Sequence, residues 1–259
     1  MVDFFGFCED IGKTVENAVS DLVGTREGWE IVTMGADGTP TRKIDQVAEN
    51  CIVEALLAER SYQTLISEEL GKLEIGGKEG TLFLDPIDGT YNAAHGVPFY
   101  ALSLALADRG IVMKGYVRDL GHRETFTASR GKGAFLNGHP IRVSATRSLH
   151  ESAMSVYGKK FDPGQVLHLG QKIRRWRLFG ASALELCYVG SGRIDAFVDL
   201  RRTLRVTDAA AGILICEEAG GMVSDLEGNP LIFPNEVTIG KSLIATNGHL
   251  HTKVIEYLR

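Results

Sequence analysis

The sequence predicts a mixed α+β and α/β fold, with an N-terminal α+β half at residues 1–145 and a C-terminal α/β half at residues 146–259. Helical and strand-like patterns alternate in the second half, which is typical of α/β proteins. Strand pairs joined by short turns fill the middle of the first half. No repeat, low-complexity tract or long polar linker lies between the halves, so we expect them to pack closely.

The first half begins with apolar side chains at helical spacing over residues 3–23, which predict an amphipathic helix. Residues 29–41 predict a short strand and then a loop, because two glycines and a proline exclude a helix there. Helical spacing returns over residues 43–59. The stretch YQTLIS predicts a strand that enters a polar segment, and TLFL at residues 81–84 predicts a strand buried on both faces.

Turn residues between apolar runs predict the later strands of the first half. The run at residues 100–119 divides into two strands at Asp108–Gly110, and Asn137–Gly138 predicts a tight hairpin. The second half is predicted to contain, in order, a strand (SAMSVYG), a helix near residues 163–174, a strand (WRLFG), a helix at 182–189, a strand (IDAFVDL), a helix at 207–219 and a strand (GMVSD).

Composition argues against two classes of partner. The net charge of -5 disfavours a nucleic-acid-binding protein, because such proteins usually carry a basic face. The longest apolar run, at residues 99–107, is too short to cross a membrane. The first ten residues lack the basic region of a secretion signal. Four cysteines without a CxxC pair predict reduced, buried thiols, so we expect a cytoplasmic protein.

Two carboxylates follow the predicted buried strand in the stretch LFLDPIDGTYN at residues 82–92. We expect the strand to end at Asp85, where Pro86 and Gly89 stop it, so that Asp85, the Ile87 carbonyl and Asp88 point at one spot. Oxygen-only ligand sets select hard cations such as Mg²⁺. The amides of Gly89 and Thr90 would lie at a helix start, where a phosphate binds well. Asp-Pro and Asp-Gly are also ordinary turn formers, so a turn without function is the alternative.

Further acids lie at positions that can complete a metal site. Glu68 and Glu69 end a strand, and Asp208 begins an apolar helix. Asp37 lies in the glycine-rich loop and Asp45 follows it. Taken one at a time, these residues also fit ordinary roles, as solvated strand ends, as a charge that complements a helix dipole or as a polar helix face.

Five motifs, in the expected order, resemble the inositol monophosphatase family. They are TRKID at 41–45, SEE at 67–69, DPIDGT at 85–90, GKGAFLNGHPIRVS at 131–144 and TDAAAG at 207–212. Together they span most of the chain. The resemblance implies the fold of the lithium-sensitive, Mg²⁺-dependent phosphatases, a layered αβαβα sandwich. Ser67 stands where the family usually has glycine, a departure that leaves the adjacent glutamate in place.

The resemblance also implies two metal sites, with two or three Mg²⁺ ions that Mn²⁺ can replace. Glu68, Asp85 and the Ile87 carbonyl match one site, and Asp85, Asp88 and Asp208 match the other, so that Asp85 bridges them. The implied mechanism is direct attack of a metal-activated water, without a phosphoenzyme.

Residues around these sites have implied roles of their own. Thr90 and Glu68 match the pair that orients the attacking water. Asp37 matches an acid that assists a further metal and water, and its loop at residues 34–41 is expected to move when metal and substrate arrive. Thr41 and Asp45 match supporting positions, with a hydrogen bond expected between Asp45 and Thr90.

The second half is expected to hold the sugar or polyol. Typical inositol monophosphatases have an acid seven residues before the aspartate that begins the helix, and here that position is Arg201. The stretch DLRRTLRVTD resembles archaeal members that hydrolyse both fructose 1,6-bisphosphate and inositol 1-phosphate. Arg201, Arg177 and Ser182 are therefore expected to bind substrate, Arg201 through a second phosphate. A solvated basic loop is the alternative for Arg201.

Three other functions stay open at this stage. The protein could hydrolyse inositol phosphate alone or 3′-phosphoadenosine compounds, or it could be a non-catalytic accessory protein of the same fold. The complete set of acids favours an enzyme. The expected partner is a small sugar or polyol phosphate, without nucleic acid or membrane, and the family resemblance implies a homodimer.

Overall fold

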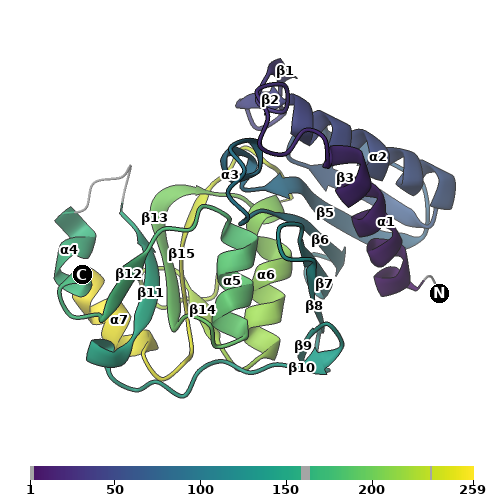
Figure 1. Ribbon diagram of the computed structural model, residues 1–259. Coiled ribbons are helices and arrows are strands. Elements are labelled where there is room, and N and C mark those ends of the chain that lie inside the picture. Colours follow the sequence, from purple (N-terminus) through teal and green to yellow (C-terminus); the bar gives the residue numbers. More distant parts are fainter. Residues whose placement is uncertain (1–2, 159–163, 234) are drawn as a thin grey trace.

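The computed structural model describes residues 3–158, 164–233 and 235–259 in five layers (Figure 1). Two helices, α1 (Phe4–Val19) and α2 (Lys43–Glu59), cover one face of an eight-stranded sheet. Helices α5 (Ser182–Gly190) and α6 (Val206–Glu218) lie between this sheet and a five-stranded sheet. Helices α4 (Gly164–Gly170) and α7 (His251–Leu258) form the outer layer beyond the second sheet. The expected layered αβαβα sandwich is confirmed.

The larger sheet belongs to the first half of the chain and the smaller one to the second. The first has the order β10-β9-β8-β7-β6-β5-β3-β4, with only the β3–β5 pair parallel. The second has the order β12-β11-β13-β15-β14, with β11 parallel to both neighbours. The strands of the first sheet are β3 (Tyr62–Ser67), β4 (Gly71–Glu74), β5 (Glu79–Asp88), β6 (Ala101–Asp108), β7 (Ile111–Asp119), β8 (Glu124–Ser129), β9 (Ala134–Leu136) and β10 (His139–Pro140). Those of the second are β11 (Ala153–Tyr157), β12 (Arg175–Arg177), β13 (Ala196–Leu204), β14 (Met222–Ser224) and β15 (Lys241–Thr246).

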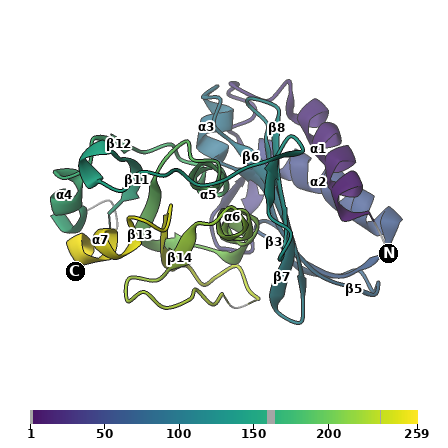
Figure 2. The ribbon, with the colours of Figure 1, turned by 90° about the horizontal axis from the view of Figure 1, so that it is seen from below.

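The central helices pack against the two sheets through two apolar clusters, one with each sheet. Helix α6 packs on β7, and a Cβ atom added at Gly115 would come within 2.8 Å of the Ala211 carbonyl oxygen. A glycine is required at this position because the helix backbone lies directly against the strand. Figure 2 looks almost along α5 and α6 and shows them between the two sheets.

Strand β5 runs further than the sequence predicts. We expected it to end at Asp85, but it continues through Pro86 to Asp88. The pairing with β6 shifts between Asp85, which faces Ser103, and Asp88, which faces Ala101. Residues three apart in a regular strand point to opposite faces, and the extra residue of this bulge cancels that alternation. The bulge therefore lets both aspartates line the same cavity, while Pro86 occupies a position where an irregular ladder tolerates it.

Most other elements agree with the sequence, with a few corrections. Helix α2 has the predicted bounds. The expected loop after β1 (Ile31–Met34) instead returns as β2 (Pro40–Arg42), which pairs with β1. Strands β4 and β15, helix α7 and the short 3-10 helix η1 (Leu149–Glu151) were not predicted. The helix expected near 163–174 is α4; residue 163 lies outside the described residues, and the predicted end is four residues too late.

The five-residue helix α3 (Thr90–Ala94) follows the bulge directly, as the sequence predicts for residues from Thr90 onward. Gly89 precedes it with φ +90° and makes the turn out of the strand. Within the described residues, no helix has the length and apolar character needed to span a bilayer.

A buried histidine connects the outer helix α7 to the second sheet. His251 Nε2 lies 2.9 Å from Ser224 Oγ, and its Nδ1 lies 3.1 Å from Thr246 Oγ1. Ser224 Oγ donates to the Asp225 carbonyl, so it accepts a hydrogen bond from the imidazole. Burial lowers the pKa of His251 below its usual value of 6.5, so the ring is neutral in the folded protein at pH 7.

This histidine predicts a pH dependence of stability. Unfolded His251 binds a proton near pH 6.5, but the folded protein binds it only at lower pH. Its contribution is therefore present above pH 6.5 and is lost as the pH falls, by at most about 1.4 kcal/mol per pH unit. The measurement is urea unfolding of the wild type and H251Q from pH 7.5 to 5.5, with EDTA present. The difference between their free energies of unfolding should shrink as the pH falls, and a constant difference would contradict this assignment.

Candidate active site

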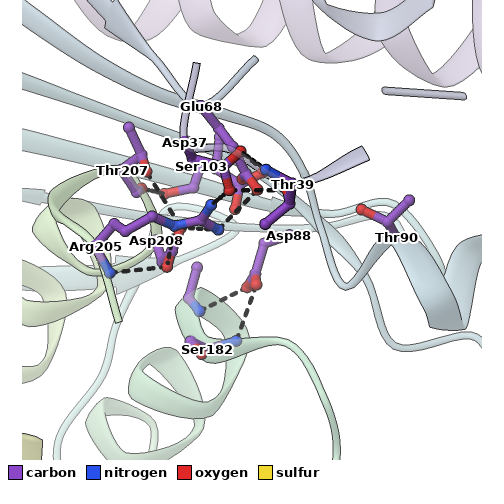
Figure 3. A network of polar contacts seen from close by, with 12 residues as sticks. Asp37, Thr39, Glu68, Asp88, Thr90, Ser103, Ser182, Arg205, Thr207 and Asp208 are labelled. Carbon is purple, nitrogen blue, oxygen red and sulfur yellow. Dashed lines mark hydrogen bonds and ion pairs between the residues drawn. The ribbon is translucent and has the colours of Figure 1, made fainter. Parts of the chain in front are cut away.

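A cluster of acids lines a cavity of about 420 Å³ that residues of both halves of the chain form. The bulge of β5, the loop before α5 and the segment from β13 to α6 form most of its wall. Figure 3 shows the polar groups gathered there. The lining residues are Asp37, Thr39, Glu68, Asp85, Ile87, Asp88, Gly89, Thr90, Gly180, Ser182, Arg201, Arg202, Thr203, Leu204, Arg205, Asp208, Val237, Thr238 and Gly240.

Three carboxylates come together from three elements. Glu68 follows β3, Asp85 lies in β5 and Asp208 lies in the first turn of α6. One oxygen atom of each lies within 4.8 Å of the others. This arrangement fits a hard divalent cation, which prefers carboxylate oxygens as ligands.

Burial and repulsion from neighbouring carboxylates raise the pKa values of two of these acids, Glu68 and Asp85. Burial raises the pKa of Glu68 well above its usual value, and the charges of Asp208 and Glu69 raise it further. Burial also raises the pKa of Asp85, with Glu68 and Asp88 adding to the effect. Since a bound cation would favour the charged forms, the titration of the cluster fits a metal site.

Asp88 lies in the same cavity but outside this trio, and it connects the two halves of the protein. Its Oδ1 accepts the amide of Ser182 at 3.0 Å and its Oδ2 accepts the amide of Ala183 at 2.6 Å. These amides are the first of α5, so Asp88 caps a helix from a distant part of the chain. Burial and the nearby Asp208 raise the pKa of Asp88 to about 7.

The β1–β2 hairpin brings Asp37 to the cavity rim. Asp37 Oδ1 accepts the Thr39 amide at 2.8 Å, which closes the hairpin loop. The hairpin is tied to the β3–β4 turn by the Ala36 amide, which donates to the Glu69 carbonyl at 2.8 Å. Thr41 is buried beside the cavity and its hydroxyl donates to the Glu69 carboxylate.

The expected hydrogen bond between Asp45 and Thr90 is confirmed. Thr90 Oγ1 lies 3.0 Å from Asp45 Oδ1 and 3.1 Å from the Ile87 carbonyl oxygen. Asp45 is buried at the start of α2, and its Oδ2 accepts the Arg42 amide at 3.2 Å. Burial and the charge of Glu69 raise the pKa of Asp45 to about 8. Thr90 is thus held between α2 and the bulge.

A residue that the sequence did not single out supports the turn carrying Glu68. Glu49 of α2 accepts hydrogen bonds from the Ser67 hydroxyl and, at 3.0 Å, from the Leu70 amide. Its carboxylate therefore spans both sides of the Glu68–Glu69 turn. Ser67, the departure from the family glycine, supplies one of these two bonds.

Arg205 was also missed, although it lies at the centre of the acids (Figure 3). Its Nη1 contacts Asp37, its Nη2 lies 2.7 Å from Glu68 Oε1, and its Nε lies 3.1 Å from Asp208 Oδ2. The sequence signal was its place three residues before the Asp208 helix start. That spacing predicts a local cap, and it says nothing of the contacts with Asp37 and Glu68.

Arg201 lines the cavity as predicted, in an arrangement that the sequence did not reveal. Asp199 holds its guanidinium side-on, with distances of 3.0 Å from Nε and 2.6 Å from Nη2. The guanidinium also lies 4.2 Å from the ring centroid of Tyr157. An acid is therefore present near the position where typical family members have one. It lies two residues earlier in the sequence than the count of seven, and β13 is irregular between Asp199 and Leu204.

The other two predicted substrate residues differ in position. Ser182 lines the cavity at the start of α5, with its amide on Asp88. Arg177 is exposed on the edge strand β12, and its Nη1 donates to the Trp176 carbonyl at 3.0 Å. The structure does not bring Arg177 to the cavity wall, because β12 lies at the far edge of the second sheet.

A buried acid lies behind the substrate wall. Glu185 of α5 accepts hydrogen bonds from Tyr157 at 3.2 Å and from the Phe179 amide at 3.2 Å, and it contacts the Ser155 hydroxyl. Burial raises the pKa of Glu185 to about 8. The residue therefore anchors the loop at residues 178–181 to the second sheet.

Comparison with known proteins agrees with this geometry. The family model described as the inositol monophosphatase family matches residues 8–259. A fructose-1,6-bisphosphatase/inositol-1-monophosphatase of Methanothermobacter thermautotrophicus is 42% identical, over 98% of this chain and 95% of that protein. A bifunctional NADP phosphatase/NAD kinase of Methanococcus maripaludis is 36% identical over 98% of this chain, which spans 49% of that relative.

Solved structures share the whole architecture. One described as an inositol monophosphatase–fructose 1,6-bisphosphatase superposes with a TM-score of 0.91 at 29% identity, with both chains fully covered. An inositol monophosphatase of Thermotoga maritima superposes with a TM-score of 0.83 at 30% identity, over 99% of this chain and 97% of that one.

Gly89 generates a prediction about the turn below the cavity. A Cβ atom at this residue would lie 3.0 Å from the Phe99 carbonyl oxygen and 3.2 Å from that of Gly180, at φ +90°. Gly138 has φ +78° with nothing within 4 Å, so it is a matched control. We expect G138A to cost about 1 to 2 kcal/mol, the usual penalty of a left-handed conformation. G89A should cost about 1 to 3 kcal/mol more because the added atom meets backbone on two sides.

Urea unfolding of both variants measures this difference. Equal losses in G89A and G138A would show that the turn can move away from the added atom and would contradict the close approach described for Gly89.

Proposed function

The chain belongs to the inositol monophosphatase family, and we propose that it is a Mg²⁺-dependent phosphatase acting on fructose 1,6-bisphosphate and inositol 1-phosphate. Its family and its relatives make it a phosphoric monoester hydrolase. The observation that carries the choice of substrates is the placement of Arg201 in the same cavity as the acid cluster. One part of the cavity suits a metal and the phosphate that reacts, and the other suits a second anionic group.

The donor atoms fit Mg²⁺, with Mn²⁺ as a substitute. Glu68, Asp85, Asp88, Asp208 and the Ile87 carbonyl would hold two or three ions. All are oxygen donors, and described cavity-lining residues include no cysteine or histidine. Bound Mg²⁺ supplies charge that neutralises the phosphoryl oxygens and makes water a better nucleophile at neutral pH.

The protein's own residues would position the reactants. Glu68 would accept a hydrogen bond from the attacking water, and Thr90, fixed by Asp45, would orient that water from the other side. The backbone of Gly89 and Thr90 adjoins the place of the phosphate. Thr41 would act indirectly. Its hydroxyl binds Glu69, whose carbonyl binds the Ala36 amide, and these bonds hold the β1–β2 hairpin that carries Asp37 to the cavity rim.

Direct attack by water agrees with a described cavity lining that includes no cysteine or histidine. Burial raises the pKa of Cys8 and Cys187 well above the ordinary thiol value, so neither is a thiolate at neutral pH. The four cysteines are unpaired. We include a cytoplasmic location in the proposal because unpaired thiols persist in reducing compartments. A homodimer and lithium sensitivity are included on the family resemblance alone.

The second phosphate of fructose 1,6-bisphosphate would bind Arg201, with the Ser182 backbone or hydroxyl contacting the sugar. A guanidinium fork suits phosphate, and Asp199 keeps it in one orientation before substrate arrives. The expected contribution of Arg177 has less support, since its side chain lies outside the cavity lining.

The first test compares phosphate release from fructose 1,6-bisphosphate, inositol 1-phosphate and NADP, with Mg²⁺ and then with EDTA. We expect turnover of the first two substrates and its loss in EDTA. Turnover of inositol 1-phosphate alone would contradict the second-phosphate site. NADP is included because of the relatives named NADP phosphatase/NAD kinase, and NADP turnover alone would replace the proposed substrates.

Conversion of Asp88 to asparagine separates an enzyme from an accessory protein. D88N removes a negative charge from the cavity and turns an amide NH₂ toward a backbone donor of α5. We expect a loss of at least about 100-fold in kcat/KM, together with destabilisation of about 1 to 3 kcal/mol. Substantial activity in folded D88N would contradict the proposed catalytic role.

Arg201 should control the choice between substrates. R201Q is expected to raise KM for fructose 1,6-bisphosphate about 10-fold or more and to change KM for inositol 1-phosphate much less, because only the bisphosphate has a second phosphate. R175Q, which removes the same charge from exposed β12, is the control for a general loss of positive field. Equal effects of R201Q on both substrates would contradict a specific second-phosphate contact.

A further inference from the structure

Tyr157 connects two groups of the substrate wall from behind. It is the last residue of β11, and its ring lies against the Arg201 guanidinium, with 4.2 Å between Arg201 Cζ and the ring centroid. Its hydroxyl accepts a hydrogen bond from the Gly180 amide at 2.8 Å. Arg201 and Gly180 both line the cavity, whereas Tyr157 is not among its described lining residues. One side chain therefore contacts the proposed second-phosphate residue and the loop before α5.

The register of the second sheet explains why this tyrosine reaches Arg201. Strand β11 lies beside β13 (Figure 1), and Tyr157 pairs with Asp199 of that strand. Asp199 Oδ2 accepts a hydrogen bond from Arg201 Nη2 at 2.6 Å. The acid thus holds one edge of the guanidinium while the ring supports its face, and an arginine can make both contacts at once because its charged group is planar. Together they fix the direction and the tilt of the guanidinium.

A buried acid fixes the Tyr157 hydroxyl. Burial raises the pKa of Tyr157 above its usual value of 10, so the hydroxyl keeps its proton at neutral pH. It donates a hydrogen bond to Glu185 Oε1 at 3.2 Å, and the same oxygen accepts the Phe179 amide at 3.2 Å. Glu185 therefore holds the tyrosine and the loop at residues 178–181 through a single atom.

We propose that Tyr157 is a positioning residue that sets the preference for the bisphosphate substrate, by holding Arg201 and the loop at residues 178–181 at a fixed separation. This role rests on the proposed function, because Arg201 is the residue assigned there to the second phosphate. A guanidinium without the ring behind it would turn among several rotamers, and ordering it when substrate arrives would lower the affinity. The tyrosine removes that cost before binding.

The ring and the hydroxyl of Tyr157 have separate consequences. Loss of the ring removes the support of the Arg201 face, so binding of the second phosphate weakens. Loss of the hydroxyl leaves the ring in place but removes the acceptor of the Gly180 amide. Gly180 lies two residues before Ser182, which is expected to contact the sugar, so this second change should affect both substrates alike.

Steady-state kinetics of Tyr157 variants test this assignment. The readout is the selectivity, defined as kcat/KM for fructose 1,6-bisphosphate divided by kcat/KM for inositol 1-phosphate. Y157L should lower the selectivity about 5-fold, mainly through KM for the bisphosphate, because the aromatic face is lost. Y157F keeps that face, so it should lower kcat/KM about 3-fold for both substrates and leave the selectivity unchanged.

Three further variants separate this role from a general loss of packing. F197L removes a buried ring whose centroid lies 6.0 Å from that of Tyr157, and it should leave the selectivity unchanged. In an R201Q background, Y157L should lower the selectivity no further, since its effect passes through Arg201. Y157M should match Y157L, because methionine fills irregular space without an aromatic face, and it covers a failure of Y157L to fold.

Each outcome decides a different point. Unchanged selectivity in folded Y157L or Y157M would overturn the role of Tyr157 and leave the phosphatase proposal intact. An equal fall in F197L would overturn it too, because packing alone would then be the cause, and an equal fall in Y157F would overturn the role of the ring. Failure of the wild type to hydrolyse fructose 1,6-bisphosphate would instead overturn the second-phosphate part of the proposed function, and this inference with it.

Discussion

Repulsion between carboxylates held close together in a buried cavity is the interaction that the rest of this structure has to balance. Glu68, Asp85 and Asp208 approach within 4.8 Å, and burial is the main reason why the pKa values of Glu68 and Asp85 are raised. Three kinds of contact offset this repulsion. The Arg205 guanidinium lies among the acids, backbone amides of α5 bind Asp88, and Glu49 holds the turn that carries Glu68. Rigid support is needed because each acid would otherwise turn away from the others.

The two-sheet architecture brings acids from distant parts of the chain into one cavity and holds them there. Glu68 follows the end of β3, Asp85 lies where the pairing of β5 becomes irregular, and Asp208 lies in the first turn of α6. The bulge in β5 is the key local feature, since it sets Asp85 and Asp88 on one cavity although three residues separate them in a strand. Helices α5 and α6 then bring amides and Asp208 from the second half to the first.

Sequence patterns predicted the elements better than their junctions. Helix α2 and the β6–β7 pair were readable from apolar spacing and a turn, because local chemistry decides them. The acids that we propose as metal ligands were readable because their motifs are short and contiguous. The contacts of Arg205 with Asp37 and Glu68 were not, since these two partners lie more than a hundred residues away in sequence. The hydrogen bonds between Asp199 and Arg201 were not predicted either. Strand β15 was not predicted although Gly240 directly precedes it, and in the structure it pairs with β13 and β14.

The cap that Asp88 places on α5 has a stereochemical consequence. A carboxylate oxygen offers two lone-pair directions, and on each Asp88 oxygen one of them is taken by an amide of the helix. A cation can then approach only along the remaining direction of each oxygen. The direction from which a cation could meet this side chain would thus be limited by α5, a helix that contributes none of the proposed metal-binding side chains.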